Sequence, residues 1–254
     1  MWYSDKMNRI SIVLNFFLIF MMFFMSCAAR ITGSLQGDGQ ADLNINTSLE
    51  PRVATLIGRF ATVYGSAEPG SPVLDANTIN ASMSAAPGIE SVSFRNITPS
   101  AIEGPVKILQ IKDFLASNLA DSGGKTGGQQ SNFINFEQDA GGGRCTISLS
   151  LDSGPEILSL ISPDISLYLS ALMAPLATGE AFSKAEYLSL VSTVYGRGIA
   201  DEIAGAAVNA SIDFPGLVQS VKGGTFSGRR AEFKIPLIDI LVLETPLSYE
   251  VVWK

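Results

Sequence analysis

The stretch that decides the fold is GDGQADLNINTSLEP at residues 37–51, because GGGRCTISLSLDSGP at residues 141–155 repeats its pattern at an offset of 104 residues. In both passages a glycine-rich turn leads into alternating apolar and polar residues, as in a half-buried strand. Each passage then offers a polar N-cap and a proline for the first turn of a helix. Residues 31–35 and 133–136 are expected to complete the two hairpins.

The helix after Pro51 is expected to bury one apolar stripe, because its apolar residues recur with helical spacing. Gly65 is placed to end it. A second helix is expected to start at Asp75 and to stop before Pro87-Gly88. The stripe of the first helix consists of Val53, Leu56, Ile57, Phe60 and Val63.

Later passages also match in pairs, although with gaps. PGIESV at 87–92 resembles PGLVQSV at 215–221, and IKDFL at 111–115 resembles LIDIL at 237–241. These pairs predict an internal duplication; because few residues are identical, chance similarity within an α+β chain is the alternative. The two units and the glycine-rich linker between them are expected at about 30–114, 134–241 and 119–131.

The second half is richer in helix. Ser183 and Glu186 form a capping-box pattern that starts one helix, and Ile199 to Ala206 is expected to form another. Residues 235–243 are apolar apart from Asp239, which predicts a doubly buried strand or an exposed interaction patch. Strands are expected within 208–214, 231–235 and 249–253. The predicted fold is α+β: one domain, 41–254, in which helices cover one face of an antiparallel sheet built from the two repeats.

The N-terminus has the pattern of a lipoprotein signal. Lys6 to Arg9 supply a basic segment, and an apolar run over 10–25 ends at Ser26-Cys27. A small residue directly before a cysteine resembles the bacterial lipobox, which implies a diacylglycerol on the sulfur of Cys27, cleavage after residue 26 and acylation of the new amino terminus. Residues 27–40 would then be a lipidated tether, and an uncleaved anchor helix is the alternative. Alanine, not aspartate, follows the cysteine, which fits sorting to the outer membrane.

Composition excludes several classes of function. The net charge of −7 gives no electrostatic reason to expect binding to nucleic acid or to acidic lipid surfaces. The absence of histidine removes imidazole metal sites and histidine-assisted nucleophiles. Cys145, left without a partner if Cys27 carries lipid, is expected to pack as a small apolar side chain. We therefore expect no enzymatic activity, no metal and no cofactor.

Two acidic residues could still suggest catalysis. Asp113 and Asp239 interrupt apolar runs at matched places, so a pair of carboxylates is conceivable. The plainer interpretation is that each caps a turn or lies at a sheet edge. Gly124-Lys125-Thr126 lacks the preceding glycine of a phosphate loop and is expected to belong to the linker.

The segment FPGLV at 214–218, followed by Gly223-Gly224, Ser227-Gly228 and the strand 230–234, resembles the LppM-type domain of bacterial envelope lipoproteins. The early glycine turn at 37–39 fits the same order of elements. This resemblance implies an amphiphile ligand, but it transfers no ligand-contacting residue. Two functional classes stay open: a lipid- or amphiphile-binding lipoprotein, and a structural or assembly lipoprotein that binds another envelope protein.

The segment 157–176 is apolar on nearly every side, more than one buried stripe requires. One interpretation places an apolar ligand between the helices of the second half and the sheet. The other is a central helix covered by its neighbours, with no cavity beside it.

Overall fold

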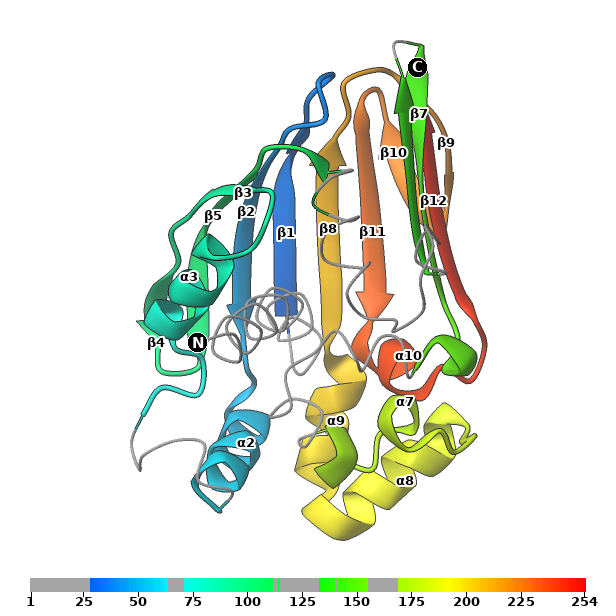
Figure 1. Ribbon diagram of the computed structural model, residues 1–254. Helices are drawn as coiled ribbons and strands as arrows, with labels where there is room; N and C mark the ends of the chain where they lie inside the picture. Colours follow the sequence, from blue (N-terminus) through cyan, green and yellow to red (C-terminus); the bar gives the residue numbers. More distant parts are fainter. Residues whose placement is uncertain (1–27, 64–70, 112–113, 115–132, 140, 155–168) are drawn as a thin grey trace, which may run out of the picture.

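The computed structural model describes residues 28–63, 71–111, 114, 133–139, 141–154 and 169–254. In these residues the chain forms two β-sheets, and most helices gather at one end of the larger sheet (Figure 1). The predicted α+β class is confirmed. The predicted signal peptide, Cys27 and the linker 119–131 lie outside the described residues.

The larger sheet, sheet A, contains eight strands in the order β10-β11-β8-β1-β2-β5-β3, with β4 also paired to β5. Its neighbours are antiparallel except for β1 and β8, which run parallel. The sheet is thus mixed, and the prediction of a purely antiparallel sheet is wrong. A parallel pair needs a long connection, and here most of the chain lies between the two strands. The strands are β1 (Ala28–Leu35), β2 (Ala41–Ser48), β3 (Ile89–Val92), β4 (Arg95–Thr98), β5 (Ala101–Ile108), β8 (Ala207–Asp213), β10 (Gly224–Ser227) and β11 (Arg230–Pro236).

The smaller sheet, sheet B, is antiparallel throughout, in the order β6-β7-β12-β9. It stands next to the β10–β11 edge of sheet A (Figure 1). Its last strand, β12, ends beside the C-terminus and pairs with both β7 and β9. The strands are β6 (Ile134–Asp139), β7 (Gly142–Leu149), β9 (Val218–Lys222) and β12 (Leu247–Trp253).

Several helix starts are those that the sequence predicts. Asp75 is the N-cap of α3, where its side chain accepts a hydrogen bond from the backbone N–H of Asn77 at 3.1 Å. Ser183 and Glu186 form the predicted capping box of α8. Within the described residues, no helix is long and apolar enough to span a bilayer. The helices are α2 (Pro51–Val63), α3 (Ala76–Ser84), the 3₁₀ turn η2 (Leu151–Ser153), α7 (Pro175–Thr178), α8 (Lys184–Tyr195), α9 (Arg197–Gly205) and α10 (Leu237–Val242).

One end of sheet A is a junction between strands and helices. Ala28, the first residue of β1, is paired with Ser48 at the end of β2 and with Ala207 at the start of β8. Ala207 is in turn paired with Pro236 at the end of β11. Helices α2, α9 and α10 therefore join the sheet at the end where β1 begins, and Figure 1 shows them below it with α7 and α8. Among the described residues, α3 contacts β3 and β4, and α10 contacts the end of β11. The prediction of helices covering one face is therefore not confirmed for the group at the end of the sheet.

The two sides of sheet A differ in chemistry, because side chains alternate along each strand and paired residues share a side. One side carries buried apolar residues such as Ala29, Ile45, Ile102, Val208 and Ala231. The other carries polar and charged residues, most of them exposed, and antiparallel sheets commonly leave one side in water.

The domain begins earlier than predicted. Residues 28–35 form a central strand of sheet A, and a turn at 36–40 links it to β2. The sequence predicts a tether over 27–40 and, within it, a hairpin strand over 31–35. The hairpin strand is confirmed and is longer, because the β1–β2 pairing extends over all eight residues from Ala28 to Leu35. A strand that is paired on both sides cannot act as a free linker, so residues 28–40 belong to the folded domain.

A duplication is not shown by the structure. The two predicted hairpins lie in different sheets, and the second half has strands β8, β10 and β11 with no counterpart in the first. Each hairpin does belong to a similar set of four antiparallel strands, β1-β2-β5-β3 in sheet A and β6-β7-β12-β9 in sheet B. The matched passages themselves differ, because residues 237–241 are helical in α10 and residues 112–113 and 155–168 lie outside the described residues.

The apolar run over 235–243 is neither of the two structures expected. It leaves β11 at Pro236 and forms the short helix α10. All of its apolar residues from Leu237 to Leu243 are at most 7% exposed. The run is buried as predicted, but as a helix, and it offers no exposed patch for a protein partner.

Candidate functional site

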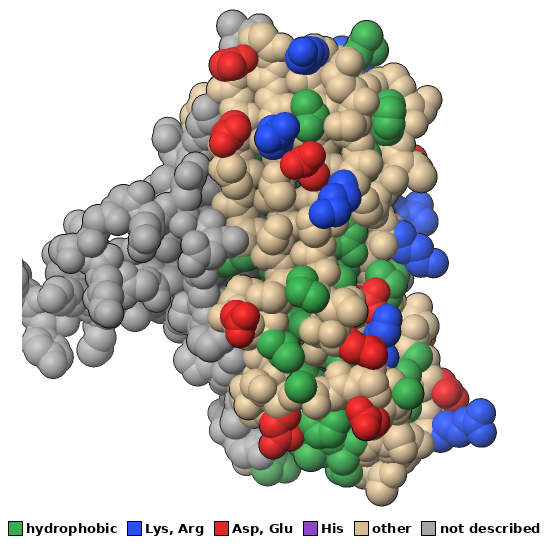
Figure 2. Space-filling model, turned by 90° about the vertical axis from the view of Figure 1, so that its right-hand side faces the viewer, with side chains coloured by type: hydrophobic (Ala, Val, Ile, Leu, Met, Phe, Trp, Pro, Cys, Tyr) green, Lys and Arg blue, Asp and Glu red, His purple; other side chains and the backbone are tan. Residues whose placement is uncertain are grey.

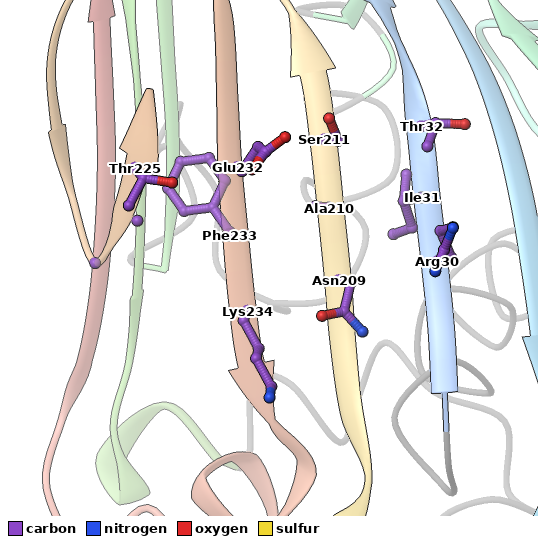
Figure 3. A pocket seen from close by; sticks show the side chains of 12 residues that line it. Arg30, Ile31, Thr32, Asn209, Ala210, Ser211, Thr225, Glu232, Phe233 and Lys234 are labelled. Atoms are coloured by element: carbon purple, nitrogen blue, oxygen red, sulfur yellow. The ribbon is translucent and has the colours of Figure 1, made fainter. Parts of the chain in front are cut away.

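The polar side of sheet A holds a surface hollow of about 790 Å³ that lies across strands β1, β8, β11 and β10. Figure 3 looks onto this side, where Lys234, Asn209 and Arg30 project from β11, β8 and β1. The polar side chains that line it are Arg30, Thr32, Asn209, Ser211, Thr225, Glu232 and Lys234.

Three of these residues form a row, called here the cationic row: Arg30, Asn209 and Lys234. Arg30 is paired with Asn209 across β1 and β8, and Asn209 with Lys234 across β8 and β11. Since neighbouring strands lie about 4.8 Å apart, the backbones at the two cations are separated by roughly 10 Å. The amide of Asn209 lies between them, so the row can donate hydrogen bonds from three side chains in one line.

The two cations of the row have no ionic partner among the described residues, whereas most neighbouring charges on this side are paired. Arg230 contacts Asp213 at 2.7 Å, and Lys107 contacts Asp42 at 3.7 Å. On the other side of Arg30, Asn46 of β2 and Glu103 of β5 continue the line of paired residues. Glu103 forms an ion pair with Arg95 and accepts a hydrogen bond from Asn46.

Glu232 is the acidic residue of the hollow, two positions from Lys234 on the same side of β11. The balance within the hollow is still one positive charge, carried by solvent-exposed side chains. The arrangement can bind an anion or a ligand rich in hydrogen-bond acceptors.

The cavity predicted between the second-half helices and the sheet is not found among the described residues. Leu169 and Leu172 are 1% and 2% exposed and belong to the main core. Tyr187 from α8 donates a hydrogen bond to the carbonyl of Leu172 at 3.3 Å, which ties this segment to its neighbour. Residues 157–168 of the predicted segment lie outside the described residues. The described part supports the packed alternative.

Of the two acidic residues singled out in the sequence, the structure describes one. Asp239 lies in the first turn of α10 and contacts the ammonium of Lys184 at 2.9 Å. This hydrogen bond and the charge of Asp239 raise the pKa of Lys184. Asp113, the other member of the suggested carboxylate pair, lies outside the described residues.

Cys145 is half-buried on β7, and desolvation raises the pKa of its thiol to about 11. At neutral pH it is therefore a neutral thiol, in agreement with its expected role as a small apolar side chain. Among the described residues, no group of three or more acidic or cysteine side chains is placed to hold a metal ion.

Comparisons with known proteins give a likeness of fold. No protein-family model matches the sequence, and no curated protein matches it. Among solved structures, the NMR structure of the folded domain of Mycobacterium tuberculosis LppM is similar, with a TM-score of 0.41 and 11% identity over 90% of each chain. The resemblance noted in the sequence is to the same type of domain.

Sequence reasoning did not find the cationic row. Arg30, Asn209 and Lys234 come from three separate strands, and Asn209 follows Arg30 by 179 positions in the chain. The signal that was present is alternation, since each lies between apolar neighbours on its strand. Alternation assigns them to a polar side, but only the pairing of β1 with β8 places them together.

Proposed function

We propose that this chain is a non-enzymatic lipoprotein of the bacterial cell envelope, anchored through Cys27, that binds an amphiphile with an anionic head group. The lipobox-like end of the apolar N-terminal run supports the anchor, and Ala28 after the cysteine supports sorting to the outer membrane. The cationic row supports the ligand class. Phosphate and carboxylate groups are the natural partners of an unpaired arginine and lysine beside an amide.

The observation that carries the ligand proposal is that Arg30 and Lys234 flank Asn209 over an open hollow without ionic partners among the described residues. Overall charge argued against acidic lipid, but a net charge of −7 summed over the chain does not describe this local site. Over distances longer than about 8–10 Å exposed charges are screened at physiological salt, so the nearest groups dominate binding.

Binding of a short-chain phosphatidylglycerol, below its micelle concentration, tests the ligand class. With the acylated full chain in a neutral detergent, we expect calorimetric binding that weakens at least about tenfold in a double Arg30→Gln and Lys234→Gln variant, because each charged hydrogen bond contributes about 1.5–3 kcal/mol. Matched phosphatidylcholine should bind more weakly to the unmodified chain.

A control of equal charge uses Arg144→Gln together with Lys222→Gln on sheet B. This variant should bind as the unmodified chain does, because neither residue lines the hollow. Equal losses in both double variants would mean that net charge, and not the cationic row, controls binding, and would contradict the proposed site.

The anchor is tested by metabolic labelling with a tagged fatty acid. Replacing Cys27 by serine is expected to abolish incorporation of the label, because serine lacks the thiol that receives the diacylglycerol. Cys145→Ser, which alters the other cysteine, should leave labelling unchanged. A Cys27→Ser chain that still takes up label would refute lipidation at this residue.

A further inference from the structure

The connection between the proposed anchor and the folded domain is too short to act as a tether. Ala28 is the first residue of β1, a central strand of sheet A with β2 on one side and β8 on the other. Neighbouring Cα atoms are about 3.8 Å apart, so a lipid on Cys27 would be attached one residue from the first residue of β1. Even an uncleaved helix ending at Met25 leaves only two residues, about 7 Å of extended chain.

The end of the sheet where β1 begins is also the end from which α2, α9 and α10 extend. We propose, on the basis of the anchor at Cys27, that the domain sits directly on the bilayer with this helical end as its contact surface. We call the exposed residues of α2, α8 and α9 at this end the membrane-contact surface. With a flexible tether, any side of the domain could face the bilayer. The short connection instead brings the helical end to the bilayer.

The composition of this surface fits the interface of a bilayer. Val63 at the end of α2 and Val194 near the end of α8 are 76% and 51% exposed, the first being the most exposed large apolar side chain among the described residues. Between the two helices lies a hollow of about 660 Å³ whose lining includes the half-buried Leu56 and Ile199. Figure 2 shows more hydrophobic surface over the lower, helical part of the molecule than over the upper sheet.

The charges of the surface also suit lipid head groups. Arg59 lines the hollow and has no ionic partner among the described residues. Arg52 contacts Glu202 at 3.4 Å, and Arg197 contacts Asp201 at 3.7 Å. With Glu50 included, α2, α8 and α9 carry four cations and four carboxylates, so these helices have no net charge. Apolar side chains beside an arginine suit the head-group region, because the arginine can bury its apolar stem and keep its charge in water.

Depth measurements with a nitroxide label test the orientation. The acylated full chain is placed in vesicles of phosphatidylethanolamine and phosphatidylglycerol, with Cys145→Ala removing the remaining thiol. Single cysteines then replace Val63 or Val194, and Leu217 at the opposite end of the sheet, 58% exposed, is the matched control. We expect the first two labels to be more accessible to oxygen than to a water-soluble nickel reagent, and the label at Leu217 to be fully water-accessible.

Water-like accessibility at both valine positions, in chains shown by fatty-acid labelling to be acylated, would overturn this inference and leave the anchor standing. Loss of acylation would instead overturn the proposed function. A spacer of about twelve Gly and Ser residues between Cys27 and Ala28, roughly 20 Å on average, should at least halve the depth signal. An unchanged signal with the spacer would refute the role of the short connection.

Discussion

Replacing Trp253 by alanine is expected to lower the free energy of unfolding by about 3–5 kcal/mol. Trp253 is 1% exposed although it is the penultimate residue of the chain. Its ring lies 4.8 Å from that of Phe214, just after β8 of sheet A, and 6.0 Å from that of Phe136 in β6 of sheet B. Because it packs against residues of both sheets, its loss leaves a cavity between them.

Denaturant unfolding followed by circular dichroism measures this loss, since Trp253 is also the single tryptophan after residue 2. Trp253→Phe should cost much less, because the ring nitrogen of Trp253 has no hydrogen-bond partner among the described residues and a phenyl ring fills part of the space. Phe226→Ala, at a position that is 48% exposed, should stay within about 0.5 kcal/mol. A Trp253→Ala loss below about 1 kcal/mol would show that the two sheets do not depend on this contact.

Replacing Leu172 by alanine is expected to cost about 2–5 kcal/mol, and Leu172→Trp about 1–3 kcal/mol from overpacking. Leu172 is 2% exposed, and its neighbours Leu169 and Ala174 are 1% and 0% exposed. Both substitutions should lower the melting temperature of the acylated protein. In a ligand cavity, the added ring of Leu172→Trp would displace ligand and leave the melting temperature nearly unchanged, and that result would restore the cavity interpretation.

Local signals in the sequence predicted local structure well. The β1–β2 hairpin turns through Gly39, whose φ of 89° is readily adopted only by glycine. Helix α2 starts at Pro51, and α8 starts after the Ser183–Glu186 capping box, as predicted. Each of these features depends on residues within a few positions of one another. A single sequence therefore contains all the information needed to predict them.

Strand β5 was missed because it contains Pro105, and proline is rarely found inside a central strand. In this sheet the proline is tolerated because its missing N–H faces a break between β3 and β4. The carbonyl of Pro105 accepts a hydrogen bond from Ser93 at 3.1 Å on that side, and no ladder pair is formed there. The gap between β3 and β4 therefore removes the cost of the missing N–H of Pro105, and this gap cannot be read from the sequence.

Helix α10 was missed for a different reason. A short run that is apolar on every side has no periodicity, so burial alone cannot distinguish a strand from a helix. The change from strand to helix occurs at Pro236, which is the last residue of β11 and the N-cap of α10. The cationic row could not be predicted either, since it requires the parallel pairing of β1 with β8.

That pairing has a consequence for the order in which the protein can fold. Contacts between residues far apart in the chain slow folding, because a large loop must close before they form. Strand β1 cannot pair with β8 until residues 207–213 are present, so sheet A stays incomplete until most of the chain has been synthesised. For a lipoprotein exported in an unfolded state, as proposed for this chain, sheet A would be completed only after residues 207–213 had crossed the membrane.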